Sequence, residues 1–267
     1  MIASLILTVC VAAVLIGGVK RIASVSQIVV PFMAILYFAF AIILIICNIT
    51  EIPAAIKVIV TAAFTPKAVT GGAVGSMFVA MQKGVARGIF SNEAGLGSAP
   101  IAAAAAQTKE PVRQGLVSMT GTFIDTIVIC TLTGLSIVLT GAWQVEGLEG
   151  VEVTTYAFQQ GLPFPPAVSS FVLMFCLVFF AFTTILGWDY YSERCLEYLS
   201  GGNLKHVKVY RWIYIFAVFI GPYMTVSAVW TIADIFNGLM ALPNMIALFA
   251  LSGVVVKETK AFFKKQN

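Results

Sequence analysis

Long apolar stretches alternate with short polar connections along this chain, and the pattern predicts membrane-spanning helices. A helix needs about 20 predominantly apolar residues to cross the hydrocarbon core of a bilayer. By this criterion we expect about seven spans, at residues 2–17, 26–47, 73–107, 115–139, 166–191, 212–226 and 228–256. A short surface helix is expected at residues 54–64, in the less hydrophobic connection after the second span. The last span is predicted to be one helix with a kink at Pro243, because dividing it there would place a lysine-rich tail outside the cell.

The third apolar stretch differs from the others because glycine and polar residues interrupt it between positions 84 and 106. A continuous helix of this length would measure about 50 Å, whereas the hydrocarbon core is about 30 Å thick. We therefore predict that the helix stops and restarts here. Unwound backbone at membrane depth needs protein or water as a partner, and in broken helices it often marks a binding site. The interrupting residues are Gly84, Arg87, Gly88, Ser91, Asn92, Glu93, Gly95, Gly97 and Pro100.

Composition supports an integral membrane protein. Hydrophobic residues make up 60% of the 267 positions and charged residues only 10%, which is too little polar surface for a soluble globule. The net charge of +4 comes from short basic blocks between apolar runs, a pattern that does not indicate nucleic-acid binding. Five cysteines without CxxC or Cys/His spacing support neither a disulfide framework nor a metal site. We do not expect an enzyme, since His206 is the one histidine and no nucleophile, base or metal constellation is present.

The distribution of basic residues predicts the topology. Segments 18–22, 108–114 and 192–211 and the C-terminal tail are basic and should face the cytoplasm. The connection at 142–160 carries three glutamates and should face outward. The N-terminus is then external. An odd number of spans with an external N-terminus is the arrangement expected if an upstream portion of a larger protein has been removed.

Four segments together resemble the alanine/glycine:cation symporter family, sodium-coupled importers of small neutral amino acids. These are GVARGIFSNEAGLGSAPIAAAAA, GTFIDTIVICTLTGL, FTTILGWDYYSERC and WTIADIFNGLMALPNMIAL. The resemblance implies an all-α integral membrane protein with part of the leucine-transporter-like inverted-repeat fold, core helices 4 to 10. Within a single transmembrane domain, 1–267, residues 1–50 would end the first repeat, 73–256 would form the second and 257–267 a cytoplasmic tail. The family's first core helix, with its GTGN-like motif, has no counterpart here.

The expected helix break suits an amino-acid zwitterion, which needs N–H donors for its carboxylate and acceptors for its ammonium group. Ser91 or Asn92 would donate to substrate, and Phe90 would pack on a small apolar side chain. Gly95 and Gly97 would allow the backbone to approach closely. Two structural alternatives stay open: Ser or Asn before Glu is also a helix N-cap signal, and the glycines are also typical of helix packing.

Residues 183–188 carry the expected cation site. The resemblance implies a sodium site at a Ser/Thr pair on core helix 8, which corresponds to Thr183 and Thr184. Their hydroxyl oxygens are ligands of the kind that a hard cation prefers, although threonine in a membrane helix commonly bonds its own i−4 carbonyl. Trp188, one turn later, would form a wall of the substrate cavity or belong to an interfacial aromatic belt.

Asp125 lies in the middle of a predicted span, where a carboxylate is costly and should face the protein interior. It would pair with Arg87, tune a second cation site with Thr122 and Thr126, or hydrogen-bond a neighbouring helix. A structural pairing is preferred. Asp234 and Asn237, early in the last span, are candidates for a gate or a helix cap.

The resulting expectation is sodium-coupled symport of alanine or glycine across the plasma membrane, with Na⁺ as coupling ion, no other cofactor or metal, and lipid as surroundings. The alternative is a non-transporting remnant or an assembly partner of a carrier. Because the first core helices are missing, we expect the 267-residue chain alone not to carry out coupled transport.

Overall fold

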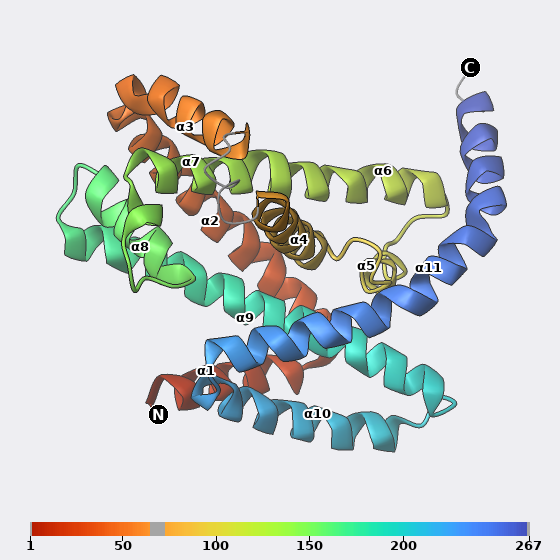
Figure 1. The fold of residues 1–267 in the computed structure, drawn as a ribbon. Coiled ribbons are helices and arrows are strands. Elements are labelled where there is room, and N and C mark those ends of the chain that lie inside the picture. Colours follow the sequence, from red (N-terminus) through yellow and green to blue (C-terminus); the bar gives the residue numbers. More distant parts are fainter. Residues whose placement is uncertain (1, 65–72, 266–267) are drawn as a thin grey trace. The chain divides into compact units, whose positions relative to one another are not determined.

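The computed structural model describes residues 2–64 and 73–265, and every regular element in these ranges is helical (Figure 1). This confirms the predicted all-α class. The α-helices are α1 (Ile2–Leu15), α2 (Gly18–Cys47), α3 (Ile52–Phe64), α4 (Ala73–Asn92), α5 (Ala99–Ala103), α6 (Pro111–Thr122), α7 (Thr131–Leu139), α8 (Val151–Gly161), α9 (Pro166–Leu199), α10 (Leu204–Ile220) and α11 (Val226–Lys264). A π-helical segment, η3 (Phe123–Cys130), joins α6 to α7, and single 3₁₀ turns lie at Ile49–Glu51, Ala142–Gln144 and Gly221–Tyr223.

Four helical stretches in the described ranges are long and apolar enough to cross a membrane: Gly18–Cys47, Pro111–Leu139, Pro166–Leu199 and Val226–Lys264. They support a multi-pass membrane protein. Helix α1 is also apolar but has only 14 residues. The total of seven spans stays a prediction.

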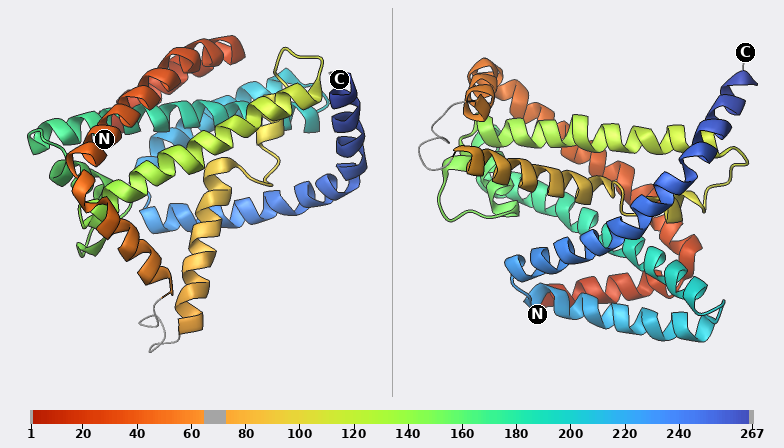
Figure 2. Two further views of the ribbon diagram at one scale, coloured as in Figure 1. Left: turned by 90° about the horizontal axis from the view of Figure 1, so that it is seen from above. Right: turned by 45° about the vertical axis from the view of Figure 1, so that its right-hand side comes forward.

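All four connections of the predicted topology contain helix. Residues 18–22 form the first turn of α2, and much of the acidic connection 142–160 forms α8, which begins at Val151. Segment 108–114 includes the start of α6, and segment 192–211 includes the end of α9 and the start of α10. The predicted boundaries were wrong because helical hydrogen bonding does not end where the sequence becomes polar. The last span is a single helix that includes Pro243, as expected, and it bends toward its C-terminal end (Figure 2).

The chain divides into two compact units, which are described separately. The first, called unit 1, comprises residues 1–71 and 129–222, and the second, unit 2, comprises 72–128 and 223–267. The boundary near residue 128 falls inside the π-helical segment η3.

Unit 1 is built around apolar packing. Helix α2 packs on α9, and α1 lies beside α10 (Figure 1). One buried cluster consists of Tyr37, Ala41, Leu44, Phe158, Leu162, Leu173 and Cys176, and a second of Val11, Val14, Leu15, Leu186 and Ile215. Polar groups close the helix ends: the Asn48 side-chain amide, just after α2, donates to the carbonyl oxygens of Leu44 and Gly161.

Unit 2 contains α4, α5, α6, most of η3 and α11. Among its described side chains only Leu96 and Ser98 are buried, and both belong to the connection between α4 and α5. This connection is the expected helix break.

Candidate functional site

Helix α4 ends at Asn92 in a Schellman motif. The Ala94 amide donates to the Ile89 carbonyl at 3.0 Å and the Glu93 amide to the Phe90 carbonyl at 3.3 Å. Glu93 occupies the left-handed position of this motif, with φ of 51°, where glycine is usual. The left-handed conformation costs a non-glycine residue about 1–2 kcal/mol. Such strain persists only where surrounding contacts impose it.

Two neighbours fix the strained turn. The Ser98 hydroxyl donates to the Glu93 carboxylate at 2.7 Å, and Ser98 is only 1% exposed. The Asn244 amide on α11 donates to the Gly95 carbonyl at 2.9 Å. At Gly97, which has φ of 81°, a Cβ atom would stand 3.1 Å from Asn244 Oδ1, so only glycine fits without a shift. The break is therefore as predicted, and the group that approaches Gly97 is the Asn244 side chain. Backbone approach to a substrate at Gly95 and Gly97 stays a prediction.

The polar residues at the end of α4 bond to η3. The Ser91 hydroxyl donates to Asp125 Oδ2 at 2.7 Å, and the Asn92 amide donates to Thr126 Oγ1 at 2.7 Å. The Asn92 amide also donates to the Gly88 carbonyl at 3.1 Å, which satisfies a free acceptor at the C-terminus of α4. The N-cap interpretation was wrong, because Asn92 ends a helix. Of the alternatives for Asp125, the hydrogen bond to a neighbouring helix is the one observed.

Arg87 pairs with α11. Its guanidinium lies 3.0 Å from Asp234 Oδ2 and stacks over Trp230 at 3.8 Å from the ring centroid. Phe90 meets the same indole edge to face, with centroids 5.2 Å apart. The proposed pairing of Arg87 with Asp125 was therefore wrong. Asp234 is not a helix cap either, since Thr225 caps α11 through the amide of Ala228.

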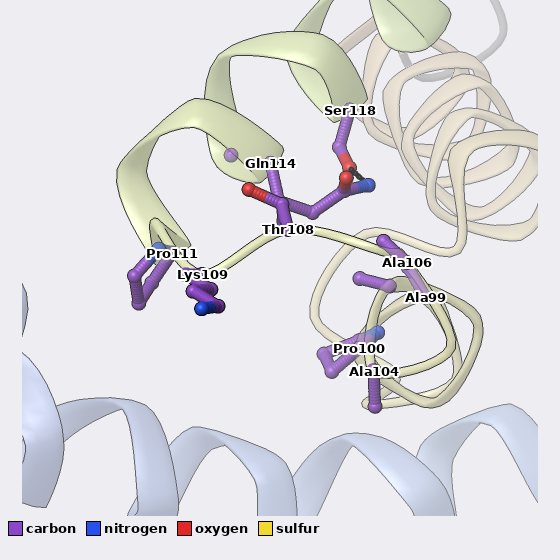
Figure 3. A pocket seen from close by; sticks show the side chains of 11 residues that line it. Ala99, Pro100, Ala104, Ala106, Thr108, Lys109, Pro111, Gln114 and Ser118 are labelled. Carbon is purple, nitrogen blue, oxygen red and sulfur yellow. Dashed lines mark hydrogen bonds between the residues drawn. The ribbon is translucent and has the colours of Figure 1, made fainter.

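Two adjoining pockets lie beside the break. The first has a volume of about 410 Å³ and is lined by Ser91, Asn92, Glu93, Ala99, Ser118, Met119, Gly121, Thr122 and Asp125. The second, of about 480 Å³, lies between α5 and the start of α6 (Figure 3). Ala99 and Ser118 line both pockets, so the two meet there. At this junction the Gln114 amide donates to the Ser118 hydroxyl at 3.3 Å (Figure 3).

The oxygen atoms around the first pocket determine what it can bind. Carboxylates of Glu93 and Asp125 and hydroxyls of Ser91 and Thr122 are acceptors for an ammonium group or a hard cation. Asn92 Oδ1 adds a buried acceptor that has no hydrogen-bond partner in the part of the chain that the structure describes. Glu93 and Ser118 were not expected from the sequence, because glutamate in a turn and serine on a helix carry no distinctive signal.

The remaining candidates lie on α9, in unit 1. The Thr183 hydroxyl donates to the Phe179 carbonyl at 2.9 Å, which is the i−4 bond considered above. Thr184 is exposed and makes no side-chain hydrogen bond to the described residues, and Trp188 packs edge to face on Tyr191 with centroids 5.7 Å apart. A sodium or substrate role for these residues stays a prediction.

An acidic and basic cluster on α9 and α10 was not foreseen. Arg211 contacts both oxygens of Glu193, through Nε at 2.5 Å and Nη2 at 2.9 Å. These hydrogen bonds raise the pKa of the Arg211 guanidinium above its usual value. Asp189, one turn before Glu193, is 1% exposed. The sequence signal was the i, i+4 spacing of Asp189 and Glu193, two acids in the last third of a long and mainly apolar helix.

The whole chain, residues 1–267, matches the model of the sodium:alanine symporter family. The chain belongs to this family. It is 54% identical over 266 residues to an uncharacterized transporter of Haemophilus influenzae, a match that covers 99% of this chain and 58% of the relative. It is 46% identical to the sodium/alanine symporter AgcS of Methanococcus maripaludis, with 98% of this chain and 56% of the relative covered. A probable sodium/glutamine symporter of Bacillus subtilis is 38% identical, with 98% and 54% covered.

Membership in this family confirms the resemblance inferred from the four sequence segments. The family is one of transporters, and its description names sodium as the coupling ion and alanine as the transported molecule. The chain spans a little more than half the length of the curated relatives it matches.

Proposed function

We propose that this chain provides the second inverted repeat of a sodium-coupled symporter for small neutral amino acids, alanine or glycine, in the cell membrane. The observation that carries the proposal is the polar helix break in an apolar chain of this family. The AgcS relative is named a sodium/alanine symporter, which favours alanine as the first substrate to test. Residues 1–50 would end the first repeat, residues 73–256 would form the second, and the basic C-terminus would face the cytoplasm.

The break offers acceptors for the ammonium group of an amino acid. The C-terminus of α4 carries the negative end of the helix dipole, and Asn92 Oδ1 and the Ser91 hydroxyl lie at that end. Gly95 and Gly97 lie in the same turn, and their backbone groups are not covered by a side chain of their own. Phe90, fixed against Trp230, would contact a small apolar side chain. A substrate of the size of alanine fits a pocket of about 410 Å³ with room for water.

The sodium ligands in this proposal are Thr183 and Thr184, with Trp188 as a cavity wall. Thr183 uses its proton to bond the Phe179 carbonyl, so the lone pairs of its oxygen stay available for a cation. The exposed Thr184 hydroxyl has no hydrogen-bond partner within residues 2–64 and 73–265. A second cation site would use Asp125 and Thr122, which line the pocket beside α4, with Thr126 next in the chain.

A chimaera tests the proposal. Because the chain matches 56% of the Methanococcus maripaludis symporter, it can replace the corresponding part of that relative. The purified chimaera is reconstituted in liposomes, and uptake of radiolabelled alanine is measured with and without an inward sodium gradient. We expect accumulation only with the gradient. A monodisperse chimaera that accumulates no alanine or glycine, or accumulates them equally without sodium, contradicts the proposal.

The sodium ligands are tested in the same chimaera. Replacing Thr183 and Thr184 together with alanine should shift the sodium activation curve more than the alanine saturation curve, because hydroxyl ligands are lost while the cavity keeps its shape. Thr155→Ala is the matched control, since Thr155 makes the same i−4 bond on α8. An unchanged sodium curve in the double variant removes both threonines from the cation site.

A further inference from the structure

The Asp189 side chain is a buried carboxyl group without a partner. It is 1% exposed, and neither of its two carboxyl oxygens has a hydrogen-bond partner among the described residues. It lies on α9 in unit 1, where α1, α2, α8 and α10 all pack against that helix. The chain itself therefore encloses this carboxyl group.

The groups around Asp189 are already engaged. Titratable groups that face it are Glu193 from α9 and Arg211, Tyr210 and Tyr214 from α10. Arg211 gives two N–H groups to the two oxygens of Glu193. Tyr214 donates its hydroxyl proton to the Ile185 carbonyl at 2.8 Å. Tyr210 hydrogen-bonds to Ser192, whose own proton goes to the Trp188 carbonyl.

The charges in this cluster do not balance if both acids are ionised. One guanidinium faces two carboxylates, and Glu193 takes its hydrogen bonds. An isolated carboxylate in a low-dielectric interior is far less favourable than a neutral carboxylic acid at the same place. The buried Asp189 carboxyl group is therefore more stable in its neutral form than as a carboxylate.

We propose that Asp189 is a proton-binding site, neutral while Glu193 stays ionised on Arg211. The proton moves from hydronium to a carboxyl oxygen of Asp189 and leaves water, and the reverse step returns it. A metal cation fits less well, because it needs several oxygen ligands and Glu193, the acid that faces Asp189, already bonds Arg211 through both of its oxygens. The described residues also contain no group of three His, Cys, Asp or Glu that would hold a metal ion.

The site has a consequence for transport that rests on the proposed function. Asp189 lies five residues after Thr184 on the same helix, close to the basic segment expected in the cytoplasm. Its protonation changes the charge of α9 next to the proposed sodium ligands. Transport should therefore depend on pH through Asp189.

Infrared spectroscopy on the full chain in nanodiscs tests protonation without any transport assay. The sequence contains three aspartates, Asp125, Asp189 and Asp234. In an Asp125→Asn/Asp234→Asn variant with ¹³C-labelled aspartate, we expect a carboxylic-acid carbonyl band at neutral pH that shows the isotope shift. Adding Asp189→Asn should abolish the shifted band. Absence of that band in the first variant overturns the proposal.

If a variant does not fold, the labelled native chain still tests the proposal. Its isotope-shifted band at neutral pH can come only from a protonated carboxyl group of one of these three aspartates. Absence of the shifted band there also overturns the proposal. Its presence, together with its persistence in Asp125→Asn and in Asp234→Asn measured singly, supports Asp189. In the chimaera, Asp189→Asn should flatten the dependence of alanine uptake on pH, whereas Asp234→Asn should preserve it. An inactive chimaera contradicts the proposed function but leaves the infrared result intact.

Discussion

The two units are stabilised by different interactions. Unit 1 has two buried apolar clusters and an ion pair whose acid, Glu193, is only 2% exposed. Unit 2 buries only Leu96 and Ser98 among its described side chains, and its helices meet through polar contacts such as Arg87 with Asp234 and Ser91 with Asp125. Regions with few buried apolar contacts open at lower free energy. The comparison therefore predicts that unit 1 is the stable part and that unit 2 rearranges more readily.

The largest expected effect comes from the buried ion pair of unit 1. Arg211→Gln leaves the Glu193 carboxylate buried and unpaired, which should reduce the free energy of unfolding by about 3–5 kcal/mol. Denaturant unfolding in detergent micelles measures this change. Arg113→Gln is the control, because its pair with Glu110 is exposed and should contribute less than about 1 kcal/mol. Similar losses in both variants would contradict the difference in burial.

The next effect tests the packing of unit 1. A Cβ atom at Gly161 would stand 2.7 Å from Leu44 Cγ and 2.9 Å from Thr140 Cγ2. Gly161→Ala should therefore destabilise the protein by about 1–3 kcal/mol through overpacking. Gly134→Ala meets no atom within 4 Å and should be neutral or stabilising by about 0.5–1 kcal/mol. If thermal unfolding shows the same shift for both variants, the clash does not determine stability.

A smaller effect concerns the strained turn of unit 2. A double-mutant cycle between Glu93→Gly and Ser98→Ala should give a coupling energy of about 1–2 kcal/mol. Either single substitution already removes the hydrogen bond from Ser98 to the Glu93 carboxylate, so the double variant does not lose it a second time. Glu93→Gly also relieves the left-handed strain, so it should be less destabilising than Ser98→Ala. A coupling energy of zero, measured by unfolding in detergent, would mean that Ser98 does not fix the turn.

The smallest expected effect is at the ion pair of unit 2. The side chains of Arg87 and Asp234 are 35% and 41% exposed, so Arg87→Gln should cost no more than about 1 kcal/mol. Arg87→Lys keeps the charge and tests the stacking on Trp230. If Arg87→Gln proves as destabilising as Arg211→Gln, the two units do not differ in the way proposed here.

The helix break could be predicted from residues close together in the sequence, whereas contacts between residues far apart in the sequence could not. Glycine, proline and charge within a few residues of Ser91 marked where α4 would end, and it ends at Asn92. Nothing local shows that Arg87 meets Asp234, 147 residues later, or that Asn244 bonds the Gly95 carbonyl. Such pairs depend on how helices pack, which one sequence does not determine.

Helix boundaries were the other source of error. Lys20 and Arg21 suggested a loop, yet they continue α2, because charged side chains at a helix end reach water while the backbone stays bonded. The π-helical form of η3 around Asp125 also had no recognisable signal. The roles of Thr183, Thr184 and Trp188 stay predictions that rest on family membership.

The backbone of the break also implies an asymmetric joint. Joining α4 and α5 into one helix would require negative φ at Glu93, Gly95 and Gly97, which all have positive values. Glycine changes between these conformations at little cost, so the α5 side of the joint is soft. Glu93 is held in its left-handed conformation by the hydrogen bond from the buried Ser98, so the α4 side is stiff. Any rotation of α5 during a transport cycle should therefore be absorbed at the two glycines, while the end of α4 keeps its shape.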